Sequence, residues 1–181
     1  SRQSRGLGDV YKRQGVNMQL SSSLENVEWY GRGPHENYID RKASAFMGSY
    51  SAKVNEMKFD YGRPQENGYR TQTKQLSITD QDGVGLQFMG LPEFSFAVHN
   101  NTTDDYDDGA WKNSKRKDVL GNPKNSHLND IKPRDLLNLN IDYRQMGVGG
   151  DNSWGAKPHD QYLIWPKDYT YSFTIQPITI E

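Results

Sequence analysis

The chain has 181 residues, a formal net charge of −1 and no cysteine. This length is typical of one domain, and the balanced charge argues against binding to nucleic acid or to an anionic membrane surface. The lack of cysteine excludes disulfides and thiolate metal sites. No apolar run approaches the roughly 18 residues of a membrane helix, so we expect a soluble protein and no membrane partner. The compartment is left open between cytoplasm and periplasm.

The first residues do not resemble the rest of the chain. Residues 1–14 are polar and basic and have no periodicity, which is typical of a tag, a cloning scar or translated adapter sequence. We therefore expect residues 1–15 to be a non-native or disordered leader. The domain is then expected over residues 16–181, incomplete at its N-terminal side.

Short alternations of apolar and polar residues recur along the chain and predict β-strands. The apolar members are Val27 and Trp29; Val84, Leu86 and Phe88; Phe94, Phe96 and Val98; Leu137, Leu139, Ile141 and Tyr143; and Tyr169, Tyr171, Phe173 and Ile175. No stretch has sustained helical periodicity. The fold class predicted is all-β, an antiparallel β-sandwich.

Three irregular segments interrupt these strands. Residues 69–79 change phase near Gln75, which predicts a β-bulge. Residues 31–40 are expected to form a loop, in which Pro34 starts a short helical turn with Glu36 at its positive end. Residues 100–134 form a long, charged segment, and we interpret its middle as a variable lid or a contact with another domain.

The most informative stretch follows the alternation at residues 137–143. Gly147, Gly149 and Gly150 are expected to adopt backbone angles closed to other residues, and Asp151, Asn152 and Ser153 to hold a tight turn by bonding their own backbone. This glycine loop (residues 147–155) presents Trp154, whose flat apolar face suits the C–H-rich face of a sugar ring. Packing at the rim of the fold is the alternative for such a tryptophan.

Three separate words of the sequence occur in a specific order. They are Asn-Val-Glu-Trp-Tyr-Gly-Arg-Gly-Pro-His-Glu-Asn-Tyr-Ile-Asp-Arg at 26–41, Pro-Gln-Glu-Asn-Gly at 64–68, and Met-Gly-Val-Gly-Gly-Asp-Asn-Ser-Trp-Gly at 146–155. Together they resemble the C-terminal β-sandwich, or small-chain region, of the large β-galactosidases of glycoside hydrolase family two. The resemblance runs from about residue 16 to the C-terminus.

The resemblance implies a role within a larger enzyme. In that family the tryptophan of the third word lines the sugar pocket, so Trp154 is expected to bind the substrate, positioned by Asp151, Asn152 and Ser153. The supporting loop is expected to contain Arg32, His35, Glu36 and Asn37, with an architectural role at the domain contact.

The family also implies partners outside this chain. Its two catalytic glutamates lie on a separate (β/α)₈ barrel, so this chain alone is expected to be inactive and to have no catalytic residue and no cofactor. Mg²⁺ and Na⁺ are expected only for the full-length enzyme. The implied partners are a β-galactoside, the missing barrel and another copy of the chain in a homo-oligomer. The sandwich itself resembles the galactose-mutarotase supersandwich.

Other interpretations of the residues remain open. Glu36 and Glu66 each occur in a Pro-x-Glu-Asn word, and a pair of carboxylates is the apparatus of glycoside hydrolysis. No His–Glu pair can be assigned for mutarotase-like catalysis. A non-catalytic carbohydrate-binding or scaffold sandwich is the rival from another class. The four histidines lack metal-ligand spacing, and the acidic run at 104–108 lacks the alternation of a Ca²⁺ loop.

Overall fold

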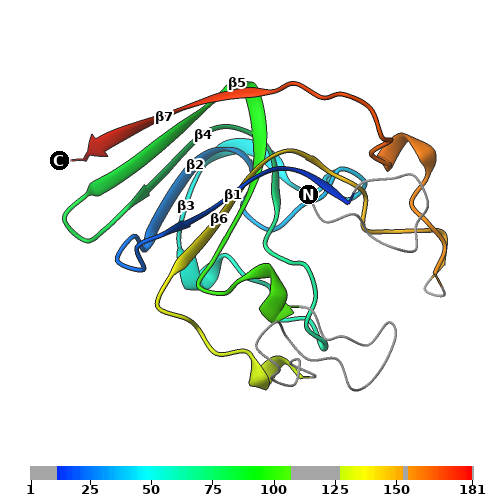
Figure 1. The fold of residues 1–181 in the computed structure, drawn as a ribbon, viewed down its shortest axis with the longest axis horizontal. Coiled ribbons are helices and arrows are strands. Elements are labelled where there is room, and N and C mark those ends of the chain that lie inside the picture. Colours follow the sequence, from blue (N-terminus) through cyan, green and yellow to red (C-terminus); the bar gives the residue numbers. More distant parts are fainter. Residues whose placement is uncertain (1–11, 107–126, 153–154, 181) are drawn as a thin grey trace.

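The computed structural model describes residues 12–106, 127–152 and 155–180. These residues form seven antiparallel strands in one open sheet of order β1-β6-β5-β4-β2-β3, with β7 also paired to β5 (Figure 1). The bounds are β1 Arg13–Leu20, β2 Asn26–Gly33, β3 Phe46–Lys53, β4 Arg70–Thr79, β5 Val84–His99, β6 Leu137–Gln145 and β7 Ser172–Thr179. The predicted all-β class is confirmed, and the sheet is consistent with a β-sandwich.

Four short 3₁₀ turns connect these strands in the described part of the chain. They are η1 Val54–Glu56, η2 Thr103–Tyr106, η3 Leu128–Asp130 and η4 Asp160–Tyr162. None of the helices in the described ranges is long and apolar enough to cross a membrane.

The sheet curls around β5, the longest strand. Strand β4 pairs with both halves of β5, whereas β7 pairs with residues Val84–Leu91 and β6 with residues Ser95–His99. Trp29 of β2 and Phe96 of β5 come from strands separated by β4, yet their rings meet edge to face with centroids 5.9 Å apart. One apolar core therefore fills the inside of the curl and takes side chains from non-adjacent strands.

Strand β6 is buried on both of its faces, which the alternation did not predict. Leu137, Leu139 and Ile141 lie in the core as expected. The opposite face was expected to be open, but Asn138 and Asp142 are only 3% and 1% exposed. Side chains from the start of the chain reach this face: Asn17 donates to Oδ1 of Asn138, and Nε of Arg13 lies 3.0 Å from Oδ2 of Asp142.

Several boundaries differ from the sequence prediction. The two alternations at residues 84–88 and 94–98 form one continuous strand, and β2 extends through residues 31–33, which were expected to begin a loop. The segment after Pro34 consists of bends, a turn at residues 39–40 and one β-bridge, and not of a helical turn. The carboxylate of Glu36 binds Arg41, Tyr61 and Gly68 instead. The predicted bulge in β4 is confirmed, with register shifts between Arg70 and Gln75.

The N-terminal strand begins at Arg13, inside the range assigned to the leader. Residues 1–11 lie outside the described part of the chain, and their origin stays a prediction. Most of the long 100–134 segment also lies outside it. Its two described ends are joined, since Arg134 binds Asp105 with both Nε and a terminal nitrogen at 2.7 and 2.6 Å.

Candidate functional site

The glycine loop is joined to a segment more than a hundred residues earlier in the chain. The backbone N–H of Gly149 donates to Oδ2 of Asp40 over 2.8 Å. Gly147 N also donates to the carbonyl of Tyr162, which lies beyond the loop. We call the first contact the Asp40 anchor. It links the first and third of the sequence words, which local patterns cannot relate.

The glycines of this loop serve close approach and not unusual backbone angles. In the described chain, positive φ occurs at Gly68, Gly83 and Gly155 among the glycines, so the predicted reason is wrong for Gly147 and Gly150. A Cβ at Gly147 would lie 2.5 Å from Oδ2 of Asp40, and one at Gly150 would lie 2.3 Å from the carbonyl of Ala156. Side chains are excluded there because other atoms already occupy the space.

The expected substrate-binding residues are only partly described. Ser153 and Trp154 lie outside the described residues. Asp151 and Asn152 are exposed; Oδ1 of Asp151 lies 2.8 Å from Nε2 of His159, and Oδ1 of Asn152 accepts from the N–H of Ala156 at 3.4 Å. These contacts brace the loop from both sides of Trp154 in the sequence.

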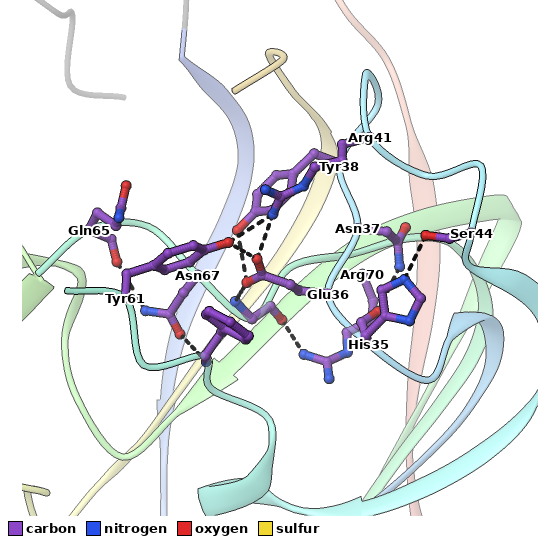
Figure 2. A network of polar contacts seen from close by, with 12 residues as sticks. His35, Glu36, Asn37, Tyr38, Arg41, Ser44, Tyr61, Gln65, Asn67 and Arg70 are labelled. Atoms are coloured by element: carbon purple, nitrogen blue, oxygen red, sulfur yellow. Dashed lines mark hydrogen bonds and ion pairs between the residues drawn. The ribbon is translucent and has the colours of Figure 1, made fainter. Parts of the chain in front are cut away.

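Glu36 forms the centre of a buried polar network, shown in Figure 2. Its carboxylate accepts from the guanidinium of Arg41 at 2.6 Å, from the backbone N–H of Gly68 at 2.7 Å and from the hydroxyl of Tyr61. The side chain of Glu36 is 8% exposed. We call Glu36, Arg41, Tyr61 and Gly68 the Glu36 network. It ties the first sequence word to the second one.

The other residues of the supporting loop also bind backbone or neighbouring side chains. Oδ1 of Asn37 accepts both the N–H and the hydroxyl of Thr71, at 3.0 and 2.6 Å. Nη1 of Arg32 donates to the carbonyl of Ala45 at 2.6 Å. His35 lies 3.0 Å from the Ser44 hydroxyl (Figure 2). Contacts of this kind fix loop geometry.

The two glutamates of the Pro-x-Glu-Asn words are each held by a different arginine. Glu36 is paired with Arg41, and Glu66 is paired with Arg13 at 2.5 Å. A retaining glycosidase needs one of its two carboxyl groups free to protonate the leaving group. Both carboxylates thus bind arginine side chains of the fold, as residues that hold loops in place do.

One carboxyl group in the fold does have a raised pKa. Burial raises the pKa of Asp142 to about 7, although Nε of Arg13 lies 3.0 Å away and favours the charged form. Asp142 is 1% exposed and therefore cannot reach a saccharide. Its raised pKa reflects desolvation inside the fold.

The histidine and acidic side chains of the described residues are spread over the fold. Within these ranges no group of three or more His, Cys, Asp or Glu side chains is placed to hold an ion. Each histidine has a different neighbour; His99, for example, is buried with Nε2 3.1 Å from the carbonyl of Asn67. The sequence offered no close ligand spacing either.

The chain belongs to the β-galactosidase small chain family. The family model described as "Beta galactosidase small chain" matches residues 3–175. A β-galactosidase of Priestia megaterium is 32% identical over 91% of this chain and 14% of its own length, and one of Vibrio cholerae is 35% identical over 91% and 14%. The β-galactosidase of Alteromonas mediterranea is 36% identical over 82% of this chain and 12% of its own length. The chain therefore spans about one seventh of the relatives it matches.

Asp40 and His159 are the residues that the sequence analysis missed. Asp40 lies inside the first sequence word, but its partner Gly149 is 109 residues away. His159 follows the third word by a few residues and carries no motif of its own. Only the three-dimensional structure brings either residue to the glycine loop.

Proposed function

We propose that this chain is the C-terminal part of a retaining β-galactosidase and that Trp154 lines the sugar pocket of the complete enzyme. The two carboxyl groups that such an enzyme needs, about 5 Å apart, would lie in the remaining polypeptide. The match to relatives named β-galactosidase supports the activity, and the small share of those relatives that it covers supports the role as a part. This chain alone would then be inactive.

The observation that carries the role of Trp154 is the Asp40 anchor. A loop that presents an aromatic ring to a sugar must hold that ring in one place, because a displaced ring loses the stacking contact. The anchor holds the loop at Gly149, five residues before Trp154. The contact between Asp151 and His159 holds it a second time, three residues before Trp154. Both contacts join the glycine loop to residues outside it.

The experiment is reconstitution with a β-galactosidase polypeptide that lacks its matching C-terminal segment. The hydrolysis of nitrophenyl β-galactoside is measured with the native chain, with Trp154→Ala and with Trp165→Ala. Trp165 is a matched control because it is a tryptophan with 47% exposure outside the glycine loop. Stacking is worth about 1 kcal/mol, so Trp154→Ala should lower kcat/KM about five-fold or more.

The control variant should behave like the native chain. Equal activity of Trp154→Ala and Trp165→Ala would remove the assignment of Trp154. Failure of the native chain to restore any activity, together with galactose binding by the chain alone, would favour a non-catalytic carbohydrate-binding sandwich.

A further inference from the structure

A polar pocket of about 210 Å³ lies next to the Asp40 anchor. Ile39 and Lys42, on either side of Asp40 in the chain, form one wall, and Tyr143–Gln145, the end of β6 that leads into the glycine loop, form another. The pocket therefore lies where the two segments joined by the anchor converge. Nothing in the proposed role of Trp154 uses it.

Positive charge gathers at this pocket. Lys42 and Arg144 line it, and Arg32 lies behind it with its Nε 2.5 Å from the amide oxygen of Gln72. The same oxygen accepts from Nζ of Lys42 at 3.1 Å. Glu93 is the one carboxylate among the described lining residues, and no ion pair within 4 Å in the described chain involves these three cations. A neutral amide thus stands where a carboxylate would balance the charge.

Three further observations indicate that this pocket suits an anion. Among the described residues, Gln72 is the one non-glycine with positive φ, at 54°, a strain that is typical of ligand sites. Nε of Arg144 is buried without a hydrogen-bond partner. The pKa of Lys42 is lowered by burial and by the neighbouring cations Arg32 and Arg144, against the opposing effect of Glu93. The local field favours negative charge.

The size of the pocket limits what fits. Small-molecule sites usually enclose about 300–1,000 Å³, so this pocket suits a single side chain better than a whole disaccharide. Guanidinium and ammonium groups bind carboxylates by charge-assisted hydrogen bonds. The relatives contain about six times as much polypeptide outside the matched segment as inside it, which offers many candidate side chains.

We propose that the pocket formed by Lys42, Gln72 and Arg144 receives the carboxylate of an Asp or Glu side chain from the remaining polypeptide of the same enzyme. This contact docks the base of the glycine loop and so fixes where Trp154 enters the active site. The identity of the partner rests on the proposed function. The anion site itself does not.

The first test is an NMR titration of the ¹⁵N-labelled chain, which needs no partner polypeptide. The probes are blocked glutamate, galacturonate, galactose and, at equal ionic strength, sodium chloride. Blocked glutamate should cause saturable shifts at Lys42, Gln72 and Arg144 with a dissociation constant on the order of 10 mM, as a few charge-assisted hydrogen bonds provide. Galactose and chloride should not.

The variant Lys42→Gln/Arg144→Gln should weaken this binding at least about tenfold. Lys74→Gln is the matched control, because Lys74 is an exposed lysine of β4 outside the pocket. Shifts that chloride reproduces, or that the double variant retains, would overturn the anion site. Binding of galacturonate more than tenfold tighter than that of blocked glutamate would overturn the side-chain occupant.

The second test separates this proposal from the role of Trp154. Association with the remaining polypeptide is measured directly, apart from activity, at low and high salt. Lys42→Gln/Arg144→Gln should weaken association at least about tenfold and reduce its salt dependence, whereas Trp154→Ala should lower activity and leave association unchanged. Unchanged association of the double variant would overturn the docking role.

Discussion

The Glu36 network and the Asp40 anchor each join distant parts of the chain through one carboxylate, but they differ in burial and in the number of donors. Glu36 is buried and satisfied by a guanidinium, a phenol and a backbone N–H. Asp40 is half-buried; its Oδ2 accepts one backbone N–H, and Oδ1 is buried without a partner among the described residues. We infer that the first carboxylate stabilises the fold and that the second positions a loop.

The largest effect should come from the Glu36 network. Glu36→Ala leaves the buried N–H of Gly68 and the guanidinium of Arg41 without their acceptor, so we expect a loss of about 3 kcal/mol in the free energy of unfolding. Urea denaturation followed by circular dichroism measures it. Glu28→Ala, on the exposed side of β2, is the control and should change stability little. Equal stability of the two variants would contradict a structural role for Glu36.

Protonation of His99 tests the same buried region through pH. Burial lowers the pKa of His99 to about 4, below the 6.5 of the unfolded chain. Between these values the unfolded state binds more protons, so this contribution to stability is present above pH 6.5 and is lost as the pH falls toward 4. The stability difference between the native chain and His99→Gln should therefore shrink by on the order of 2 kcal/mol from pH 7 to pH 4.5.

Comparison with the variant isolates this histidine from the other groups that titrate in the same range. Urea unfolding of both proteins at the two pH values provides the measurement. A difference that stays constant with pH would mean that His99 is not held neutral by burial.

A smaller effect is expected at the Asp40 anchor. Gly147→Ala places a Cβ at 2.5 Å from Oδ2 of Asp40 and must push the loop away from it. Gly147 is itself buried, but residues 148–150 after it are exposed and can adjust, so the unfolding free energy should fall by only about 1 kcal/mol. In the reconstituted enzyme, activity should fall more than this loss of stability explains. Gly149→Ala is the control, because its Cβ would meet Asp40 at an ordinary 3.5 Å.

The smallest effect concerns the ends of the 100–134 segment. Arg134 is half exposed and pairs with Asp105, so Arg134→Gln should cost only about 0.5 kcal/mol. The loss should disappear at high salt, because the interaction is screened. A loss that is independent of salt would point to packing in place of charge.

Local patterns predicted the fold because strand alternation and core burial coincide in this chain. Val27, Phe88 and Phe96 lie in the core as their alternation required. Strand β3 escaped prediction because it is an edge strand with half-exposed faces; Phe46 at its start is 71% exposed and gives no apolar-inside pattern. The burial of the polar face of β6 was not predicted because the side chains that bind it come from distant segments, as in the hydrogen bond from Asn17 to Asn138.

The candidate site was less predictable for the same physical reason. Sequence words identified Glu36 and Asn37 as members of a supporting loop, but their partners Gly68 and Thr71 are set by tertiary contacts. Gly147 and Gly150 were expected to adopt unusual backbone angles, whereas the close approach of Asp40 and Ala156 explains why a side chain is excluded at both positions. When the role of a residue depends on a partner far along the chain, that role cannot be predicted from its neighbours in the sequence.

The central claim is that the Asp40 anchor acts through Trp154, and a double-mutant cycle on kcat/KM in the reconstituted enzyme tests it most directly. Asp40→Ala should lower kcat/KM by about as much as Trp154→Ala, Asp40→Asn should recover part of the loss by keeping an acceptor, and the double variant should be no worse than Trp154→Ala alone. Losses that simply multiply in the double variant would show that the two residues act independently, and would contradict the account.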